Sequence, residues 1–304
     1  MRLACLILAH ENPSQLQRLI RRLTNNGTDI FIHLDKKEDD IAELVTLTSL
    51  YKNLFLVKQR VDVRWGAFSM IQATLNSLSE MATHGAYDYI SLLSGSDYPI
   101  KSNKEIADFF IRNNGKEFIY YRKDPSPELP LGGSDRFEYY YDYDSTAANK
   151  DEYESEMKER NVKRSFIAGM QPYHGSQWWS LTGRCIGYLL NAAASNKELV
   201  NYYRYTKFPD EQFFQTIIMN SGFASSVVNN NLRYIDWSDI NWPAIDWVDF
   251  KPHPRTLQQH DIRKLQYTEK LFARKFNENT DPAVLDIIDR SLLKYRKPIR
   301  SDLQ

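Results

Sequence analysis

Short apolar runs alternate with segments of helical periodicity along the first half of the chain, and this alternation constrains the fold most. Leu3–Ala9 is an uninterrupted apolar run, which is typical of a strand buried on both faces. Asn12 then has the position of a helix N-cap before Pro13, and apolar residues recur at helical spacing up to Gly27. A strand, a helix and another strand in this order predict a βαβ unit with parallel strands.

The alternation continues along most of the chain. Further strands are predicted at residues 30–34, 54–57, 89–93, 117–121, 232–235 and 270–276. Further helices are predicted at residues 68–81, 104–113, 184–194, 209–219 and 282–293. The sequence therefore predicts a Rossmann-like α/β fold, with a mixed, mainly parallel sheet and helices on both faces.

One segment breaks the pattern, and it sets the predicted organisation. Residues 124–170 contain a tyrosine-rich run and a charged stretch at 150–164 that is predicted to be helical. We expect a single domain over residues 1–304, in which 1–123 form a nucleotide-binding half and 171–304 a catalytic, diphosphate-binding half. The segment between these halves is predicted to be an excursion over the acceptor side.

The composition limits the partners and the compartment. The 39 basic residues balance the 39 acidic ones, so no overall field attracts nucleic acid and any anion site must be local. The two cysteines, Cys5 and Cys185, lack CxxC spacing, which indicates a reducing compartment. No signal peptide or membrane-spanning segment is predicted, whereas the basic run at 292–300 could contact an anionic membrane surface. We expect a cytoplasmic protein, peripheral to the inner face of a membrane.

Polar residues follow three of the predicted strands. Ala9 and His10 end the first strand, Asp35 ends the second, and Ser96 and Asp97 follow the strand at 89–93. Ligands of open α/β sheets bind beyond the carboxyl ends of the strands, so these residues are candidates for a nucleoside pocket. Taken alone, Asp35 is also explained as an ordinary residue of a turn. No GxGxxG or GxxxxGK[ST] motif is present, which excludes dinucleotide and P-loop sites.

A second candidate is the carboxylate pair after Pro209. Glu211 opens a predicted helix with an aromatic face behind it, so it could be a desolvated general base. The alternative is simple stabilisation of the helix dipole, worth about 0.3–1 kcal/mol. Basic residues gather near the end of the chain, and strand alternation would turn either Arg274 or Lys275 inward. An inward cation requires an anion such as a diphosphate.

Metal and sugar contacts each have a candidate. Asp142 and Asp144 form a DxD pair, as in many metal-dependent nucleotide-sugar enzymes, but they do not follow an apolar strand, so a coincidental match is the alternative. The strand that ends before Ser96 offers a single carboxylate, which is a poor divalent-ion site. Trp178, Trp179 and Trp237 lie beside small and polar residues, so they could stack on sugar rings or serve as core.

Seven segments in series resemble the core-2/I-branching β-1,6-N-acetylglucosaminyltransferases and the related peptide O-xylosyltransferases. They run over nearly the whole chain. They are LILAHENPSQLQRLI from Leu6, IFIHLDKK from Ile30, LLSGSDYPI from Leu92, GSQWWSLT from Gly175, PDEQFFQTI from Pro209, NNNLRYIDW from Asn229 and KLFARKF from Lys270.

This resemblance implies a GT-A fold, a UDP-sugar donor, inversion at the anomeric carbon and no requirement for a metal or other cofactor. It implies that Glu211 is the general base, and that Lys275 and Arg255 hold the donor diphosphate. It further implies that Asp35 and the His10 loop bind uridine, and that Trp237 lines the acceptor side.

The excursion departs from both relatives, so the resemblance does not transfer an acceptor, and a glycan or glycolipid is expected. The chain is expected to be a bacterial-type member that moves a sugar onto a glycan hydroxyl in polysaccharide biosynthesis. GlcNAc is the first candidate for this sugar. A UDP-xylose-dependent transferase, a metal-dependent transferase using Asp142 and Asp144, and a non-catalytic glycan-binding protein are the alternatives.

Overall fold

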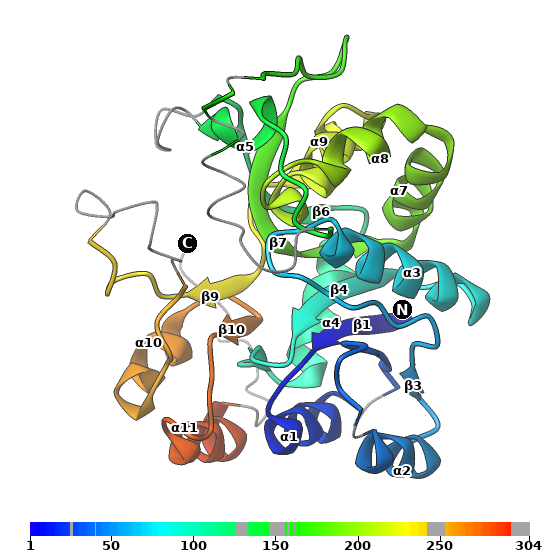
Figure 1. Cartoon of the computed structure of the whole chain (residues 1–304). Helices are drawn as coiled ribbons and strands as arrows, with labels where there is room; N and C mark the ends of the chain where they lie inside the picture. Colours follow the sequence, from blue (N-terminus) through cyan, green and yellow to red (C-terminus); the bar gives the residue numbers. More distant parts are fainter. Residues whose placement is uncertain are drawn as a thin grey trace, which may run out of the picture. The chain divides into compact units, whose positions relative to one another are not determined.

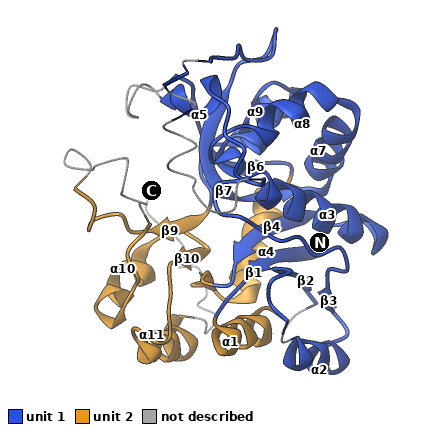
Figure 2. Cartoon of the chain, viewed as in Figure 1, with its two compact units in different colours: residues 1–11, 27–95, 115–231 blue, residues 12–26, 96–114, 232–304 orange. Residues whose placement is uncertain are grey.

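A computed structural model describes most of the chain, namely residues 1–24, 27–39, 41–125, 133–145, 156, 159–160, 162–241 and 253–292. The chain forms two compact units that interleave along the sequence (Figure 2). Unit 1 comprises residues 1–11, 27–95 and 115–231, and unit 2 comprises residues 12–26, 96–114 and 232–304. Neither unit corresponds to the predicted halves, and a single domain over the whole chain stays a prediction.

Unit 1 is built on a seven-stranded sheet with the order β3-β2-β1-β4-β7-β6-β8 (Figure 1). Its strands are β1 Leu3–Ala9, β2 Asp29–Leu34, β3 Leu54–Leu56, β4 Tyr89–Ser94, β6 Glu117–Lys123, β7 Tyr173–Thr182 and β8 Val227–Val228. β1 is parallel to β2 and β4, whereas β7 is antiparallel to β4 and β6. The predicted α/β fold class with a mixed, mainly parallel sheet is confirmed, and its GT-A character stays what the resemblance implies.

The apolar run at the start of the chain explains the centre of this sheet. Leu6 of β1 pairs with Phe31 of β2 on one side and with Leu92 of β4 on the other, and all three side chains are buried. A strand with two parallel neighbours is covered on both faces, so an uninterrupted apolar sequence suits it.

The helices of unit 1 are α2 Ala42–Leu50, α3 Ser69–Thr83, α5 Asp135–Glu138, α7 Gly183–Ser195, α8 Lys197–Arg204 and α9 Phe213–Met219. α3 packs against β1 and β2, while α7 and α9 pack against β7. The prediction of one continuous helix over residues 209–219 is wrong. Pro209–Glu211 is a separate 3₁₀ turn, and Gln212, with φ of −132°, interrupts the helical path before α9 begins.

Unit 2 combines four α-helices with a small sheet. The helices are α1 Pro13–Leu23, α4 Asn103–Arg112, α10 Ile262–Tyr267 and α11 Pro282–Ile287, which continues as a π-helical turn over Ile288–Leu292. The sheet has the order β5-β10-β9, with strands β5 Tyr98–Pro99, β9 Arg233–Ile235 and β10 Phe272–Arg274.

Side-chain caps mark two of the helix starts of unit 2. Ser102 and Glu105 form a reciprocal capping box at α4, and Asp281 accepts hydrogen bonds from two backbone N–H groups of α11. The predicted cap at Asn12 is wrong, because this residue has φ of 52° and its side chain makes no cap bond.

Further predictions fall only in part on the described residues. Cys5 and Cys185 are both buried and free of disulfides. Most of the charged stretch at 150–164 and the basic run at 292–300 lie outside the described residues. In the described part of the chain, we find no helix with the length and apolar character that crossing a bilayer requires.

Candidate functional site

The ends of strands β1, β2 and β4 meet at one edge of the unit 1 sheet. The Asp35 N–H donates to the carbonyl of Ala9 at 2.8 Å, and the Gly95 N–H donates to the carbonyl of Leu8 at 3.1 Å. The predicted meeting of these strand ends therefore occurs within unit 1. His10, the next residue after β1, is exposed and lies 3.9 Å from the carboxylate of Glu11.

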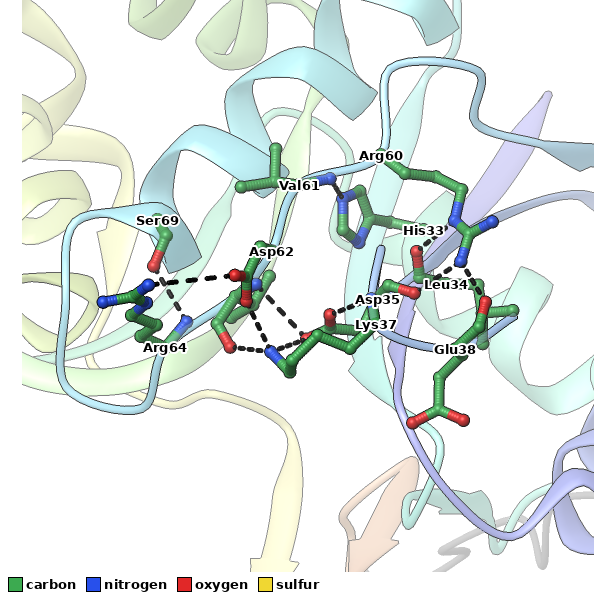
Figure 3. Close-up of polar contacts among 11 residues, drawn as sticks. His33, Leu34, Asp35, Lys37, Glu38, Arg60, Val61, Asp62, Arg64 and Ser69 are labelled. Carbon is green, nitrogen blue, oxygen red and sulfur yellow. Dashed lines mark hydrogen bonds and ion pairs between the residues drawn. The ribbon is translucent and has the colours of Figure 1, made fainter. Parts of the chain in front are cut away.

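Asp35 is buried at this edge, and both of its carboxylate oxygens accept hydrogen bonds (Figure 3). Oδ1 accepts from the Lys37 backbone N–H at 2.9 Å, and Oδ2 accepts from Lys37 Nζ at 3.0 Å and from the Val63 N–H at 3.3 Å. Burial acts against the Lys37 cation, but hydrogen bonds to Asp62 and Asp35 raise the pKa of Lys37. The carboxylate is therefore held in a fixed orientation beside a permanent positive charge.

Two further side chains fix the segment that follows β2 (Figure 3). The Arg60 guanidinium donates to the carbonyls of Leu34 at 3.0 Å and Asp35 at 2.6 Å, and it also contacts the carbonyl of Glu38. His33 Nε2 accepts from the Val61 N–H at 3.0 Å, so this nitrogen carries no proton. Burial lowers the pKa of His33 and keeps the ring neutral. The strand end is therefore preorganised by side chains that belong to no motif recognised in the sequence.

Glu211 lies in the 3₁₀ turn and not in the first turn of an α-helix. Phe208, just before the turn, has a left-handed φ of 51°, and its N–H donates to the carbonyl of Gly66 at 3.1 Å. The Glu211 N–H in turn donates to the carbonyl of Phe208 at 3.2 Å. Helix-dipole stabilisation, the alternative explanation for Glu211, needs several aligned peptide units, and a three-residue turn offers few.

Arg136 on α5 is the partner of Glu211. Arg136 Nη1 donates to Glu211 Oε2 at 2.9 Å, and the guanidinium lies 5.4 Å from the centre of the Phe208 ring. The Glu211 side chain is 40% exposed and that of Arg136 is 18% exposed. Among the described residues, Glu211 Oε1 accepts no hydrogen bond. The sequence carried no signal for Arg136, because it belongs to the excursion and lies 75 residues away from Glu211.

In unit 2, the two cations that were predicted to hold a diphosphate lie in connected segments. The carbonyl of Lys275 accepts from the Leu257 N–H at 2.8 Å, two residues after Arg255. Arg255 is already paired, since its guanidinium lies 2.6 Å from carboxylate oxygens of both Asp236 and Asp261. The Lys275 ammonium, by contrast, has no carboxylate partner in the described part of unit 2.

Of the pair Arg274 and Lys275, the inward side chain is that of Arg274. Its side chain is 14% exposed and lies beside the fully buried Asp97, with 3.5 Å between Arg274 Nε and Asp97 Oδ1. Burial lowers the pKa of Arg274, and the Asp97 charge opposes this effect. Asp97 therefore balances this cation in unit 2, and the carbonyl of the adjacent Ser96 accepts from the Phe276 N–H at 2.9 Å.

The three tryptophans differ in exposure. Trp178 and Trp179 belong to the hydrophobic core of unit 1, and the ring of Trp179 contacts that of Phe214 with 5.7 Å between centroids. Core packing therefore accounts for these two indoles, in place of the predicted contact with an acceptor. Trp237, which follows β9 in unit 2, is 37% exposed and can still present an indole face.

Both carboxylates of the DxD pair accept hydrogen bonds from backbone N–H groups. Asp144 Oδ2 accepts from the Ser69 N–H at 3.1 Å, at the start of α3, and Asp142 Oδ1 accepts from the Ser145 N–H at 3.3 Å. In the part of the chain that the structure describes, no three His, Cys, Asp or Glu side chains are grouped as a metal site requires. Independence from a metal stays a prediction.

Comparison with known proteins shows to which family the chain belongs. A sequence model described as Core-2/I-Branching enzyme matches residues 3–272. The chain is 28% identical over 308 residues to xylosyltransferase 2 of Canis lupus familiaris, covering 95% of this chain and 33% of that protein. It is 27% identical over 290 residues to xylosyltransferase oxt of Drosophila melanogaster, covering 89% of this chain and 31% of that protein. The chain thus spans about a third of the length of these relatives.

A solved structure, S. aureus TarS 1-349, aligns with a TM-score of 0.38 at 12% identity, covering 75% of this chain and 57% of that chain.

Proposed function

Because this chain belongs to the Core-2/I-branching enzyme family, we propose that it is an inverting glycosyltransferase that moves a sugar from a UDP-sugar to a hydroxyl of a glycan. The observation that carries the proposal is the state of Glu211. Its carboxylate is oriented through one oxygen by Arg136, and its other oxygen accepts no hydrogen bond among the described residues. A base held by a third group in this way is typical of sites where a hydroxyl is activated.

The reaction is an in-line displacement. Glu211 takes the proton of the acceptor hydroxyl while the hydroxyl oxygen forms a bond to the anomeric carbon. The bond from that carbon to the UDP oxygen breaks, and its electron pair leaves with UDP. Attack from the side opposite the leaving group inverts the anomeric carbon.

The charge that grows on UDP requires a positive group. We assign this role first to Lys275, since no described carboxylate neutralises its ammonium, and second to Arg255, whose charge is shared by Asp236 and Asp261. A fixed cation in a dry cleft stabilises a leaving group without reorganisation. Lys275 and Arg255 would then take the place of a divalent metal, and activity is expected to survive EDTA. A loss of transfer in EDTA that Mn²⁺ restores would favour the alternative site at Asp142 and Asp144.

The nucleoside end of the donor and the acceptor each have proposed contact residues. Ala9, His10, Asp35 and Ser96 are the proposed contacts of the nucleoside end of the donor, and Asp97 is not among them, because its side chain is fully buried beside Arg274. Trp237 is the proposed acceptor contact, since it is the exposed indole of the three predicted ones. The acceptor is proposed to be a glycan or glycolipid.

We propose GlcNAc as the transferred sugar, with xylose as the second candidate. Several relatives are named xylosyltransferases, which favours UDP-xylose, whereas the family description names the core-2/I-branching enzymes. We further propose peripheral contact with the inner face of a membrane through the basic run at 292–300, which lies almost entirely outside the described residues.

One experiment tests the proposal. Purified protein is screened against UDP-GlcNAc, UDP-xylose and other UDP-sugars by thermal shift and by release of UDP, with and without EDTA. We expect one donor to raise the Tm and to be turned over in both buffers. Glu211→Gln should keep the thermal shift and lose turnover about 10²-fold or more, because only the proton acceptor is removed. Turnover at the native rate in this variant would show that Glu211 is not the base.

The same screen separates enzyme from binding protein. A chain that binds glycans without releasing UDP from any donor would be a non-catalytic glycan-binding protein.

A further inference from the structure

The residue before Glu211 is a carboxylate in an unusual state. The Asp210 side chain lies in the same 3₁₀ turn and is 9% exposed. Its Oδ1 is buried and has no hydrogen-bond partner among the described residues. An ionised carboxylate with one buried oxygen left without a partner is costly in such a place, whereas the protonated acid is far less so.

The charges around Asp210 come from two residues. Strand β7 and helices α3 and α9 pack against the turn. α9 has no ionisable side chain, β7 carries Tyr173 and His174, and α3 carries Glu80, whereas the charges that act most on Asp210 are those of Glu211 and Arg136. Burial and, after it, the adjacent Glu211 charge raise the pKa of Asp210, while a backbone hydrogen bond and the Arg136 charge lower it, and together they raise the pKa to about 7. Asp210 therefore keeps its proton to a higher pH than an ordinary aspartate does.

Arg136 forms a hydrogen bond with Glu211 but not with Asp210. Its Nη1 donates to Glu211 Oε2 at 2.9 Å, and no hydrogen bond joins it to Asp210. The guanidinium is itself positioned over the Phe208 ring, whose backbone begins the turn. A planar guanidinium bound to one carboxylate oxygen fixes the carboxylate plane as well as its charge.

We propose that Asp210 and Arg136 are positioning residues for the base: the buried Asp210 carboxyl stays protonated beside Glu211, and Arg136 fixes the single negative charge of the two neighbouring carboxyl groups on Glu211. This inference rests on the proposed function. Two adjacent anions would repel each other and compete for one guanidinium. A neutral Asp210 leaves the whole ion pair to Glu211, with Oε1 left for the acceptor hydroxyl.

The arrangement also accounts for the return of the base to its starting state. When Glu211 takes the acceptor proton it becomes neutral, and Arg136 then faces no anion. Loss of this proton to water restores the ion pair, so the charge of Arg136 favours the ionised base before each turnover.

The first test detects the proton on Asp210 through thermal stability and requires no activity measurement. Thermal unfolding of the full chain is measured at pH 5.5 and pH 8.5 for the wild type, Asp210→Asn and the control Asp39→Asn, which changes an exposed aspartate of the same unit. We expect Asp210→Asn to gain Tm relative to the wild type on going from pH 5.5 to 8.5, by about 3 °C or more, because the amide never has to ionise. The control should show no such gain. An equal Tm difference at both pH values would show that Asp210 is ionised throughout, and would overturn the proposal.

The second test reads the positioning of Glu211. Arg136→Gln should lower kcat about 10-fold or more while the KM for the donor changes less than about twofold, since Arg136 orients the base and does not bind the donor. Arg136→Lys keeps the charge and should recover part of the lost kcat. Equal kcat in Arg136→Gln and the wild type, with both folded, would refute the role of Arg136.

The two tests separate this inference from the proposed function. If the wild type turns over no UDP-sugar, the proposed function fails, yet the thermal comparison still reports whether Asp210 holds its proton.

Discussion

Lys275 and Arg255 have different surroundings, although the sequence assigns them one role. The Lys275 ammonium has no carboxylate partner in the described part of unit 2, so an anionic ligand would be its first partner. We expect Lys275→Ala to weaken UDP binding about 10-fold or more, because a charge-assisted hydrogen bond is worth about 1.5–3 kcal/mol. Isothermal titration calorimetry with UDP measures this. The control Lys52→Ala removes an exposed lysine of unit 1 and should leave the affinity unchanged. Equal affinities for the two variants would contradict the assignment.

Arg255 is expected to affect stability before it affects binding. Asp261 is fully buried and Asp236 nearly so, and both lie 2.6 Å from the Arg255 guanidinium. Removal of one partner of a buried ion pair leaves an uncompensated charge, at a cost of about 3–5 kcal/mol. Arg255→Ala should therefore lower the free energy of unfolding by about this amount in urea denaturation.

Arg255→Lys serves as the milder variant, since it keeps the charge but loses the bidentate geometry. If Arg255→Ala unfolds at the wild-type urea concentration, the ion pairs contribute little, and a change in UDP affinity could then be read directly.

At the scale of elements, the loop at Gly66 supports the turn that carries Glu211. Gly66 has φ of +76°, and a Cβ there would lie 2.9 Å from a ring carbon of Phe208. We expect Gly66→Ala to destabilise the protein by about 1–3 kcal/mol and to lower kcat, because both the backbone and the Phe208 ring must shift. Urea denaturation and UDP release measure the two effects.

A matched glycine distinguishes this local effect from a general one. Gly187 lies on the exposed side of α7, and an added Cβ would meet nothing within 4 Å. Gly187→Ala should stabilise the protein by about 0.5–1 kcal/mol through helix propensity alone. A Gly66→Ala protein with native stability and native kcat would show that the turn tolerates displacement.

Seven strands were predicted from sequence, whereas β5, β7, β8 and the form of the turn that carries Glu211 were not. β1 is predictable because a strand between two parallel neighbours needs an uninterrupted apolar run. The break at Gln212 has no such signal, since Pro209 and the two acidic residues after it have the composition of an ordinary helix start, and apolar residues follow from Phe213. Arg136 was missed for a related reason: its contact with Glu211 is tertiary, and local spacing carries no information on it.

At the scale of the whole molecule, the interleaving of the two units could not be read from the pattern. The periodicity of helices α1 and α4 shows an apolar face but not which elements cover it. The structure assigns α1 and α4 to unit 2, together with β9 and β10 from the end of the chain. Periodicity predicts elements, and long-range packing decides their grouping.

The pH dependence of the stability of the whole chain follows from groups with opposite signs. The folded-state pKa of Asp210 is raised, so its contribution to stability is fully present below about pH 4 and is lost as the pH rises towards 7. Burial lowers the folded-state pKa of His33, so its contribution is present above about pH 6.5 and is lost as the pH falls. Between pH 5 and 7 the two contributions therefore oppose each other in the wild type.

Asp210→Asn removes one of these contributions and exposes the other. We expect its Tm to rise as the pH increases from 5 to 7, because neutral His33 keeps the hydrogen bond from the Val61 N–H that a protonated ring must give up. The wild-type Tm should rise less over the same interval, since ionisation of Asp210 offsets the gain at His33. Differential scanning calorimetry at half-unit steps of pH measures both curves. Parallel curves would mean that Asp210 does not titrate in this interval, and a flat curve for Asp210→Asn would mean that burial of His33 contributes no pH dependence.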